Sequence, residues 1–321
     1  ASLAARARVI ISCVGPYSRL GGELVAACAD AGTHYVDLCG EAPFIRRMID
    51  EHQDRATETG ARIVHSCGFD SVPSDMGAFA LLEHAGEPLT RDTMVVEELR
   101  GGLSGGTIDS MREVSAAARR DRSVARNLHH PYSLSPTPSE EPRVEGLEKD
   151  FRIRRLDDGR WSGPFFMSMF NTRIVRRSSS LRDARFLYRE CWATGRGPVG
   201  RVKAYALAGI TAALFAVAQK PFFQRFIPQP GEGPSEKQRA KGHFRFTHHG
   251  TGESGREYSC TVAAQGDPGY DVTAMMLGEA AVTLLENTAL PDTAGILTPS
   301  TGLGSAYLER LRAGGMTFAC D

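Results

Sequence analysis

Three side chains that can transfer a proton follow short apolar runs near the start of the sequence. Tyr17 comes after VIISCV, Glu41 after HYVDL and Asp70 after RIVHS. A phenol can stabilise a developing oxyanion through a hydrogen bond, and a carboxyl group can act as a general acid. Structural roles are the alternatives: the Tyr17 ring could pack over its turn, Glu41 could cap the following helix, and Asp70 could hold its loop in an Asx-turn.

Small residues accompany these three candidates. The turns read GPY from residue 15, CGE from residue 39 and CGFDSVP from residue 67. A glycine at such a position lets a ligand approach the backbone closely, although it can equally serve only to turn the chain. Because three such turns follow three strand-like runs, we favour a binding role over three unrelated turns.

The elements that would position these residues alternate between strand and helix. We expect strands at 9–14, 34–38 and 62–66, and helices at 22–31, from 42 to 60, and from 74 or 75 to about 83. This alternation predicts an α/β fold with a doubly wound parallel sheet and right-handed crossovers. Ligands of such sheets lie outside the carboxyl ends of the strands, which is where Tyr17, Glu41 and Asp70 would meet.

The rest of the sequence predicts a second domain of class α+β. Strand-like stretches recur at 93–100, 173–176, 184–188, 243–247 and 257–264. Few helices intervene, which favours a mostly antiparallel sheet. Asp271 is expected to cap one late helix, and Pro299 to open another. The glycine-rich stretch 101–106 is interpreted as a strand-to-helix turn, with an anion site at the helix N-terminus as the alternative.

The composition limits the class of protein. With 321 residues the chain is long enough for two domains. Lys plus Arg and Asp plus Glu both number 38, and this zero balance argues against a nucleic-acid partner. Seven cysteines without a C-x-x-C pair indicate neither a disulfide framework nor a metal site, and scattered thiols favour the cytoplasm.

One segment, 204–218, carries no charged residue, and basic residues flank it on both sides. It is shorter than the roughly 18–20 apolar residues of a membrane-spanning helix. Four interpretations stay open: a buried helix, an oligomer interface, a helix that lies on a membrane surface, and a wall of an acyl-chain site.

The start of the sequence lacks a dinucleotide-binding motif. Such a domain opens with a strand, the pattern G-x-G-x-x-G and a helix, and no such pattern precedes Val9. Residue 1 is Ala, residues 1–8 read like the end of a helix, and no signal peptide is visible. We therefore expect the chain to begin inside a domain.

Several of these segments resemble the saccharopine dehydrogenase-like oxidoreductases, and among them the actinobacterial trans-acting enoyl reductases of lipid synthesis. The resemblance rests on VGPY from residue 14, GTHYVD from 32, GE from 40 and CGFDSVPSD from 67. It extends over SGGT from residue 104, VRRS from 175, PGEGP from 230, DPGY from 267 and LTP from 297, so it spans nearly the whole chain.

The resemblance implies a division into three parts and a set of site residues. Residues 1–86 would be a partial NADP-binding Rossmann domain without its first βαβ half. Residues 87–290 would form a substrate and oligomerisation domain, and residues 291–321 a C-terminal helix that returns to the first domain. Tyr17 and Asp70 become the catalytic candidates. Contacts with NADP (NADPH) are expected at Val14, Gly15, Pro16, Tyr17, Gly40, Gly68, Asp70 and Ser71.

Three classes of function stay open. The resemblance implies an NADPH-dependent enoyl reductase of lipid or glycolipid synthesis, whose acyl substrate could ride on a synthase. Such a protein would be a cytoplasmic homo-oligomer that could also lie at the inner face of the plasma membrane. A saccharopine-type amino-acid imine with two or more carboxylates would instead need an arginine cluster, which Arg173, Arg176 and Arg177 could supply. A catalytically inactive lipid-surface or scaffold protein is the third class.

Overall fold

The computed structural model describes residues 2–101, 105–145, 149, 151–217, 233–286 and 289–321. Parts of several sequence segments lie outside these ranges, namely 102–104 of the glycine-rich stretch, 104 of SGGT, 218 of the apolar segment, and 230–232 of PGEGP. No helix in the described ranges is long and apolar enough to cross a membrane. The same residues contain no group of three or more His, Cys, Asp or Glu side chains that could hold a metal ion.

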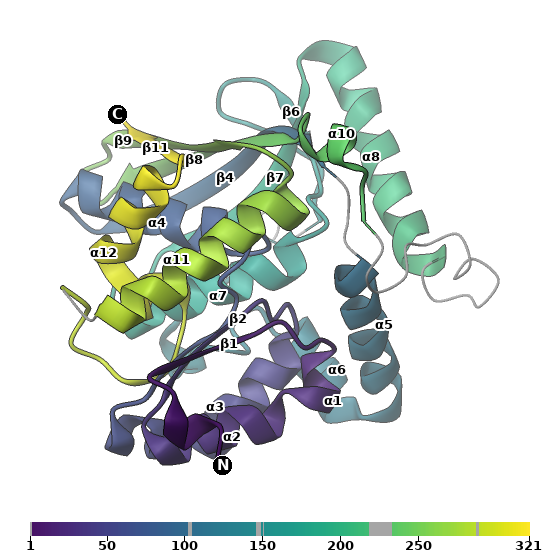
Figure 1. The fold of residues 1–321 in the computed structure, drawn as a ribbon. Coiled ribbons are helices and arrows are strands. Elements are labelled where there is room, and N and C mark those ends of the chain that lie inside the picture. Colours follow the sequence, from purple (N-terminus) through teal and green to yellow (C-terminus); the bar gives the residue numbers. More distant parts are fainter. Residues whose placement is uncertain (1, 102–104, 146–148, 150, 218–232, 287–288) are drawn as a thin grey trace.

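The first part of the chain forms a parallel sheet of four strands, as the alternating pattern predicted (Figure 1). The strands are β1 (Val9–Ser12), β2 (His34–Asp37), β3 (Arg62–Val64) and β10 (Gly295–Leu297), in the order β1-β2-β3-β10. The short helix η1 (Ala4–Arg6) precedes them, and the helices between them are α1 (Tyr17–Leu20), α2 (Gly22–Ala31), α3 (Ala42–Thr59) and α4 (Val72–Ala85). Gly32 and Gly60 end α2 and α3 in the left-handed conformation, at φ 70° and 76°, which glycine adopts at little cost.

The second sheet has seven strands in the order β11-β9-β8-β4-β7-β6-β5. The strands are β4 (Leu89–Arg100), β5 (Arg154–Arg155), β6 (Trp161–Gly163), β7 (Leu187–Gly195), β8 (His243–Gly252), β9 (Glu257–Gln265) and β11 (Thr317–Cys320). Only the β4–β7 pair is parallel, so the expected mostly antiparallel sheet is confirmed. Buried residues alternate with more exposed ones along β8 and β9, because one face of these strands packs on the core.

The remaining helices are distributed over both parts of the molecule (Figure 1). They are α5 (Gly105–Arg120), α6 (Arg122–His129), η2 (Pro138–Glu140), α7 (Ser168–Leu181), α8 (Gly197–Val217), α10 (Glu236–Arg239), the π-helical turn η4 (Pro268–Val272), α11 (Thr273–Glu286) and α12 (Pro299–Ala313).

Helix α4 lies in the core between the two sheets. Ten of its residues are buried, and one hydrophobic cluster joins Val64 of the first sheet through Met76 of α4 to Val262 of the second. At Gly77 the helix passes so close to β8 that a Cβ would lie 2.3 Å from His248 Nε2. The helix begins at Val72, earlier than expected, with Ser71 at the N-cap position but without a side-chain capping hydrogen bond.

The C-terminal segment contributes one strand to each sheet. β10 pairs with β3 of the parallel sheet, and β11 pairs with β9 at the edge of the second. Helix α12 lies between these strands in the sequence and contacts α4 and α11. The division at residues 86 and 290 stays a prediction, since the chain crosses between the two sheets more than once.

Two local predictions were wrong. Residues 173–176 lie inside α7 and not in a strand, because tertiary packing of the helix overrides the strand preference of Ile174 and Val175. The capping residue near the start of α11 is Asp267, which accepts a hydrogen bond from the Tyr270 amide, and not Asp271.

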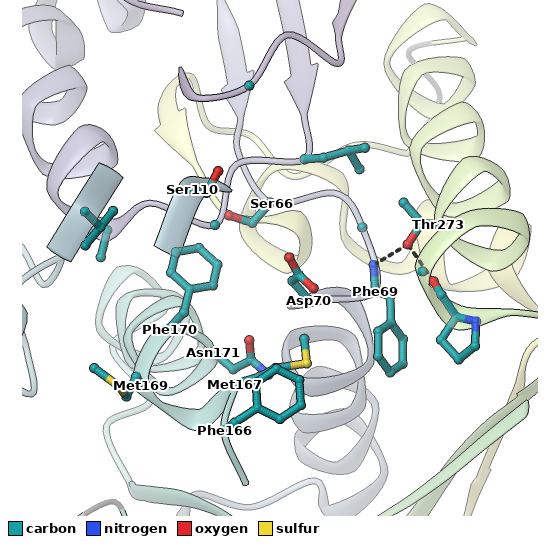
Figure 2. A pocket seen from close by; sticks show the side chains of 18 of the residues that line it. Ser66, Phe69, Asp70, Ser110, Phe166, Met167, Met169, Phe170, Asn171 and Thr273 are labelled. Atoms are coloured by element: carbon teal, nitrogen blue, oxygen red, sulfur yellow. Dashed lines mark hydrogen bonds between the residues drawn. The ribbon is translucent and has the colours of Figure 1, made fainter. Parts of the chain in front are cut away.

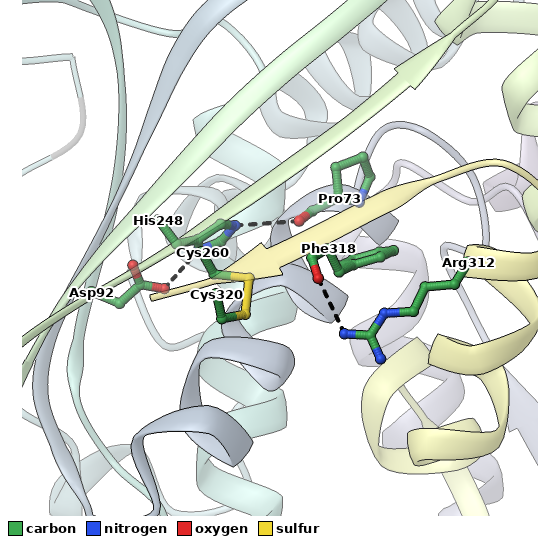
Figure 3. The surroundings of a disulfide bond; sticks show 7 residues. All are labelled: Pro73, Asp92, His248, Cys260, Arg312, Phe318 and Cys320. Carbon is green, nitrogen blue, oxygen red and sulfur yellow. Dashed lines mark hydrogen bonds and ion pairs between the residues drawn. A yellow bond between two sulfur atoms is a disulfide. The ribbon is translucent and has the colours of Figure 1, made fainter.

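The prediction from the cysteine spacing was also wrong, since Cys260 and Cys320 form a disulfide (Figure 3). The two residues lie 60 positions apart in the sequence but directly opposite each other on β9 and β11. The antiparallel register, which sequence spacing does not reveal, brings them together. The five other cysteines are free, and only Cys13 is exposed.

Candidate active site

A cavity of about 600 Å³ opens at the carboxyl ends of β1, β2 and β3 (Figure 2). One wall comes from the strand-end turns, where Gly15, Tyr17, Gly40, Gly68 and Asp70 line the space. The parallel sheet places all three turns on the same edge, as the alternating pattern predicted. Five of the eight predicted cofactor contacts therefore share one cavity.

The three other predicted cofactor contacts do not line this cavity. Val14 is 52% exposed beside it. Pro16 follows Gly15 through a cis peptide bond and occupies the N-cap position of α1. Ser71 is fully buried at the start of α4, and its hydroxyl has no hydrogen-bond partner among the described residues.

The opposite wall is apolar and belongs to the second part of the chain. Figure 2 shows Phe166, Met167 and Phe170 facing Asp70 across the space. Leu99, Leu128 and Trp192 extend this wall. The sequence analysis missed these residues, although the run FFMSMF at 165–170 is an unusually apolar cluster that could have signalled a binding wall.

Asp70 is the only charged side chain that lines the cavity in the described part of the chain. Its carboxyl group makes no hydrogen bond to a described residue, so the Asx-turn alternative is not what the structure shows. Burial raises the pKa of Asp70 to about 6. A carboxyl group with this pKa can hold or release a proton near neutral pH.

Tyr17 lines the cavity with its ring, while its hydroxyl group bonds to the strand ends. The hydroxyl donates to the Ser12 carbonyl at 2.9 Å and accepts from the Leu38 amide at 3.2 Å. Burial, and then the negative charge of Asp37, raises the pKa of Tyr17. These bonds hold the ends of β1 and β2 together.

Glu41 also has a structural role, but not the one expected. Its carboxylate accepts hydrogen bonds from the amides of Tyr17 at 2.8 Å and Ser18 at 3.0 Å, so it caps α1 and not α3. The Ser110 hydroxyl of α5 donates to the same carboxylate at 3.0 Å. Glu41 thereby joins the turn after β1 to the helix that forms another wall of the cavity.

A buried pair that does not line the cavity fixes the ends of β2 and β3. His65 Nδ1 lies 2.7 Å from Asp37 Oδ2, and the other Asp37 oxygen accepts from the Cys39 and Ser66 amides at 3.0 Å each. Cys39 and Cys67 are fully buried nearby, and burial raises the pKa of both thiols, so neither is an activated nucleophile.

The glycines that line the cavity have two different roles, since some face open space and one packs against a side chain. A Cβ on Gly15 would meet no atom closer than 3.9 Å, and one on Gly40 would lie 3.5 Å from Asp70 Oδ2. Both positions leave open space over the backbone, which suits the flat ring of a nicotinamide. Gly68 is different, because a Cβ there would lie 2.7 Å from Leu38.

The arginines proposed for a dicarboxylate substrate lie outside the cavity. Arg176 donates to the Tyr188 carbonyl at 2.8 Å, and Arg177 to the Leu134 and Ile296 carbonyls at 2.7 and 2.6 Å. Arg173 donates to the Leu128 and Met169 carbonyls. All three are buried and join α7 to neighbouring segments.

The fold of this chain is that of a solved dehydrogenase structure. The structure is similar to saccharopine dehydrogenase (L-Glu forming) from Saccharomyces cerevisiae, with a TM-score of 0.50, 10% identity, and coverage of 100% of this chain and 86% of that one. At this identity the likeness shows the fold alone. No model of a protein family matches the sequence.

Sequence relatives define the family more narrowly. The chain is 39% identical to the trans-acting enoyl reductase of Mycobacterium ulcerans over 332 positions, which cover 96% of this chain and 79% of the relative. A Mycobacterium tuberculosis protein that carries the same family name is 43% identical over 338 positions, covering 98% of this chain and 80% of the relative. The chain therefore belongs to the trans-acting enoyl reductase family, which confirms the resemblance found in the motifs.

Proposed function

We propose that the protein reduces the double bond of an enoyl thioester of lipid synthesis with NADPH. The observation that carries this proposal is the chemistry of the cavity: its second wall is apolar, and no Lys, Arg or His from the described residues lines it. An acyl chain binds favourably against such a wall, because its apolar surface is removed from water. A dicarboxylate imine would lie there without a cation to pair with its charges.

The cofactor would supply a hydride to the β-carbon of the substrate. The residues present fit the nicotinamide end of such a cofactor, because the backbone at Gly15 and Gly40 is open to close approach. The relatives' family name and the NADPH assignment by resemblance support the proposal. The adenosine end of the cofactor would need contacts beyond those of the strand-end turns.

Asp70 would handle the proton. After hydride transfer the substrate carries an enolate, and one proton must reach its α-carbon to complete the reduction. Asp70 is the ionisable side chain in the cavity that is unbonded and has a pKa of about 6. Tyr17 would hydrogen bond the thioester oxygen only by releasing the Ser12 carbonyl, to which its single O–H donates.

Turnover of the protein with NADPH and a crotonyl thioester tests the proposal. We expect Asp70→Asn to lower kcat by about 100-fold, the low end of the range for a lost general acid. Asp54→Asn, an exposed control on α3, should leave kcat unchanged. An Asp70→Asn variant with normal turnover and stability would leave Asp70 as a loop residue only.

The alternatives predict other outcomes. Reduction of an imino acid but not of the thioester would favour the amino-acid imine enzyme, and no turnover with either would favour the scaffold protein. Delivery of the acyl chain by a synthase, and a homo-oligomeric state, are parts of the same proposal. A carrier-bound thioester that reacts faster than the free thioester, and light scattering of the protein, would test them.

A further inference from the structure

The outer side of α8 is apolar although it faces solvent. The helix packs on β6 and β7 through one side, where Ala204 and Thr211 are buried. On the opposite side Val199, Val202 and Ile210 are 66%, 68% and 66% exposed. Figure 1 shows α8 at the margin of the molecule, and the exposure of these side chains means that no described element covers them.

The exposed apolar residues form one continuous stripe. Val199, Val202, Ala206, Ile210 and Ala213 are spaced by three or four positions, and all five are exposed. On a helix with 3.6 residues per turn, such positions share one face. A solvent-facing helix surface normally carries polar side chains, so a stripe of this length indicates a partner.

All charged side chains of the segment that carries this stripe are positive, and the nearby acidic group is Asp158, on the turn between β5 and β6, close to Arg196. Arg196, Arg201 and Lys203 lie at the N-terminal end of α8, and no Asp or Glu occurs from residue 191 to residue 231. The Arg201 guanidinium lies over the rings of Trp161 and Tyr205, at 5.6 and 5.9 Å from their centroids. Cations beside an apolar stripe complement a surface that is both apolar and anionic.

We propose that the outer stripe of α8, Val199, Val202, Ala206, Ile210 and Ala213, docks on the surface of a membrane that contains anionic lipid. The apolar side chains would enter the boundary between headgroups and acyl chains, and Arg201 and Lys203 would contact lipid phosphates. A second copy of the chain is the less favoured occupant, because this segment would bring it cations and no carboxylate. The proposal does not depend on the enoyl reductase activity.

The structure also decides against two earlier interpretations of this segment. A buried helix is excluded for the described part, since the stripe is exposed. A wall of the acyl site is excluded for that part as well, since no described residue of α8 lines the cavity. Docking on a surface and association between copies are the interpretations that the test must separate.

Co-sedimentation of the protein with vesicles tests the proposal without cofactor or substrate. We expect the protein to bind phosphatidylcholine vesicles that contain phosphatidylglycerol. The double variant V202N/I210N should lower the partition coefficient on the order of tenfold, since two side chains leave the apolar phase. R201Q/K203Q should lower the dependence on phosphatidylglycerol, on the order of fivefold for each cation.

The matched control is L20N/L285N, which changes two apolar residues that are 53% and 42% exposed on α1 and α11. It should bind vesicles like the unchanged protein, and circular dichroism melts should show that all variants fold.

Absence of vesicle binding, or equal binding by V202N/I210N, would overturn the proposal. A dimer in light scattering that V202N/I210N converts to a monomer, without vesicle binding, would assign the stripe to contacts between copies. Because the assay needs no turnover, its failure and the failure of the reductase proposal are distinguishable.

Discussion

Asp70 combines a polar group with an apolar environment. Its carboxyl faces Phe166, Met167 and Phe170 across the cavity (Figure 2), and it has no hydrogen-bond partner in the described chain. Burial therefore penalises the charged form, which raises the pKa to about 6. The same property that suits proton transfer should cost the folded protein stability when Asp70 is ionised.

Unfolding of the Asp70→Asn variant as a function of pH should show this cost. The pKa of Asp70 in the folded protein lies above the ordinary value of about 3.9. Its contribution to stability is therefore fully present below pH 4 and is lost as the pH rises through about 6. We expect the stability difference between Asp70→Asn and the unchanged protein to shift in favour of the variant by about 2–3 kcal/mol from pH 4 to pH 8. Urea titrations at both pH values measure it, and a difference that does not change with pH would contradict it.

At the scale of elements, Glu41 determines where α1 begins. This helix has four residues, so it depends on the carboxylate that binds the Tyr17 and Ser18 amides.

Glu41→Gln replaces one acceptor oxygen with a donor and removes the charge. We expect a loss of about 2 kcal/mol in the free energy of unfolding. Glu23→Gln, at an exposed position in the first turn of α2, should change stability by less than about 0.5 kcal/mol. Equal effects of the two substitutions would argue against the cap.

Helix α7 depends on its buried arginines in the same way. Burial, and then the positive charge of Arg46, lowers the pKa of Arg177 to about 9. Its hydrogen bonds to Leu134 and Ile296 nevertheless satisfy two carbonyl groups that the fold has removed from water. A role in stability is therefore the role that the structure supports.

Arg177→Met should destabilise the protein by about 3 kcal/mol, because those carbonyls lose their donor. The KM for a thioester should stay unchanged in variant protein that is folded, since Arg177 does not line the cavity. Chemical denaturation and steady-state kinetics measure the two quantities, with exposed Arg152→Met as the control. A raised KM for an imino acid would revive the dicarboxylate interpretation.

At the scale of the whole molecule, the C-terminal segment joins the two sheets. It gives β10 to the first sheet and β11 to the second, and the Cys260–Cys320 disulfide closes a loop with a sequence separation of 60 residues. Closing such a loop restricts the unfolded chain.

We expect Cys320→Ser to lower the free energy of unfolding by about 2–4 kcal/mol under oxidising conditions. Dithiothreitol should lower the stability of the unchanged protein equally and leave the variant unaffected. A reductant effect on both proteins would contradict this role.

Local patterns in the sequence were sufficient to predict the parallel sheet and the first wall of the site. Short β-branched runs, glycine helix ends and turns after each strand are local patterns, and the crossover rule brings those turns to one edge. Gly15, Tyr17, Gly40, Gly68 and Asp70 were therefore predictable as neighbours, and the motifs were sufficient to identify the family.

The other features could be seen only in the folded chain, because they depend on contacts between distant segments. The apolar wall at 165–170, the role of Glu41 at α1 and the disulfide each join residues far apart in the sequence. Residues 173–176 became helix because packing determines the state of a short ambiguous run. Whether an apolar helix such as α8 is buried or exposed likewise follows from what packs on it, and only the folded chain shows that one side has no cover.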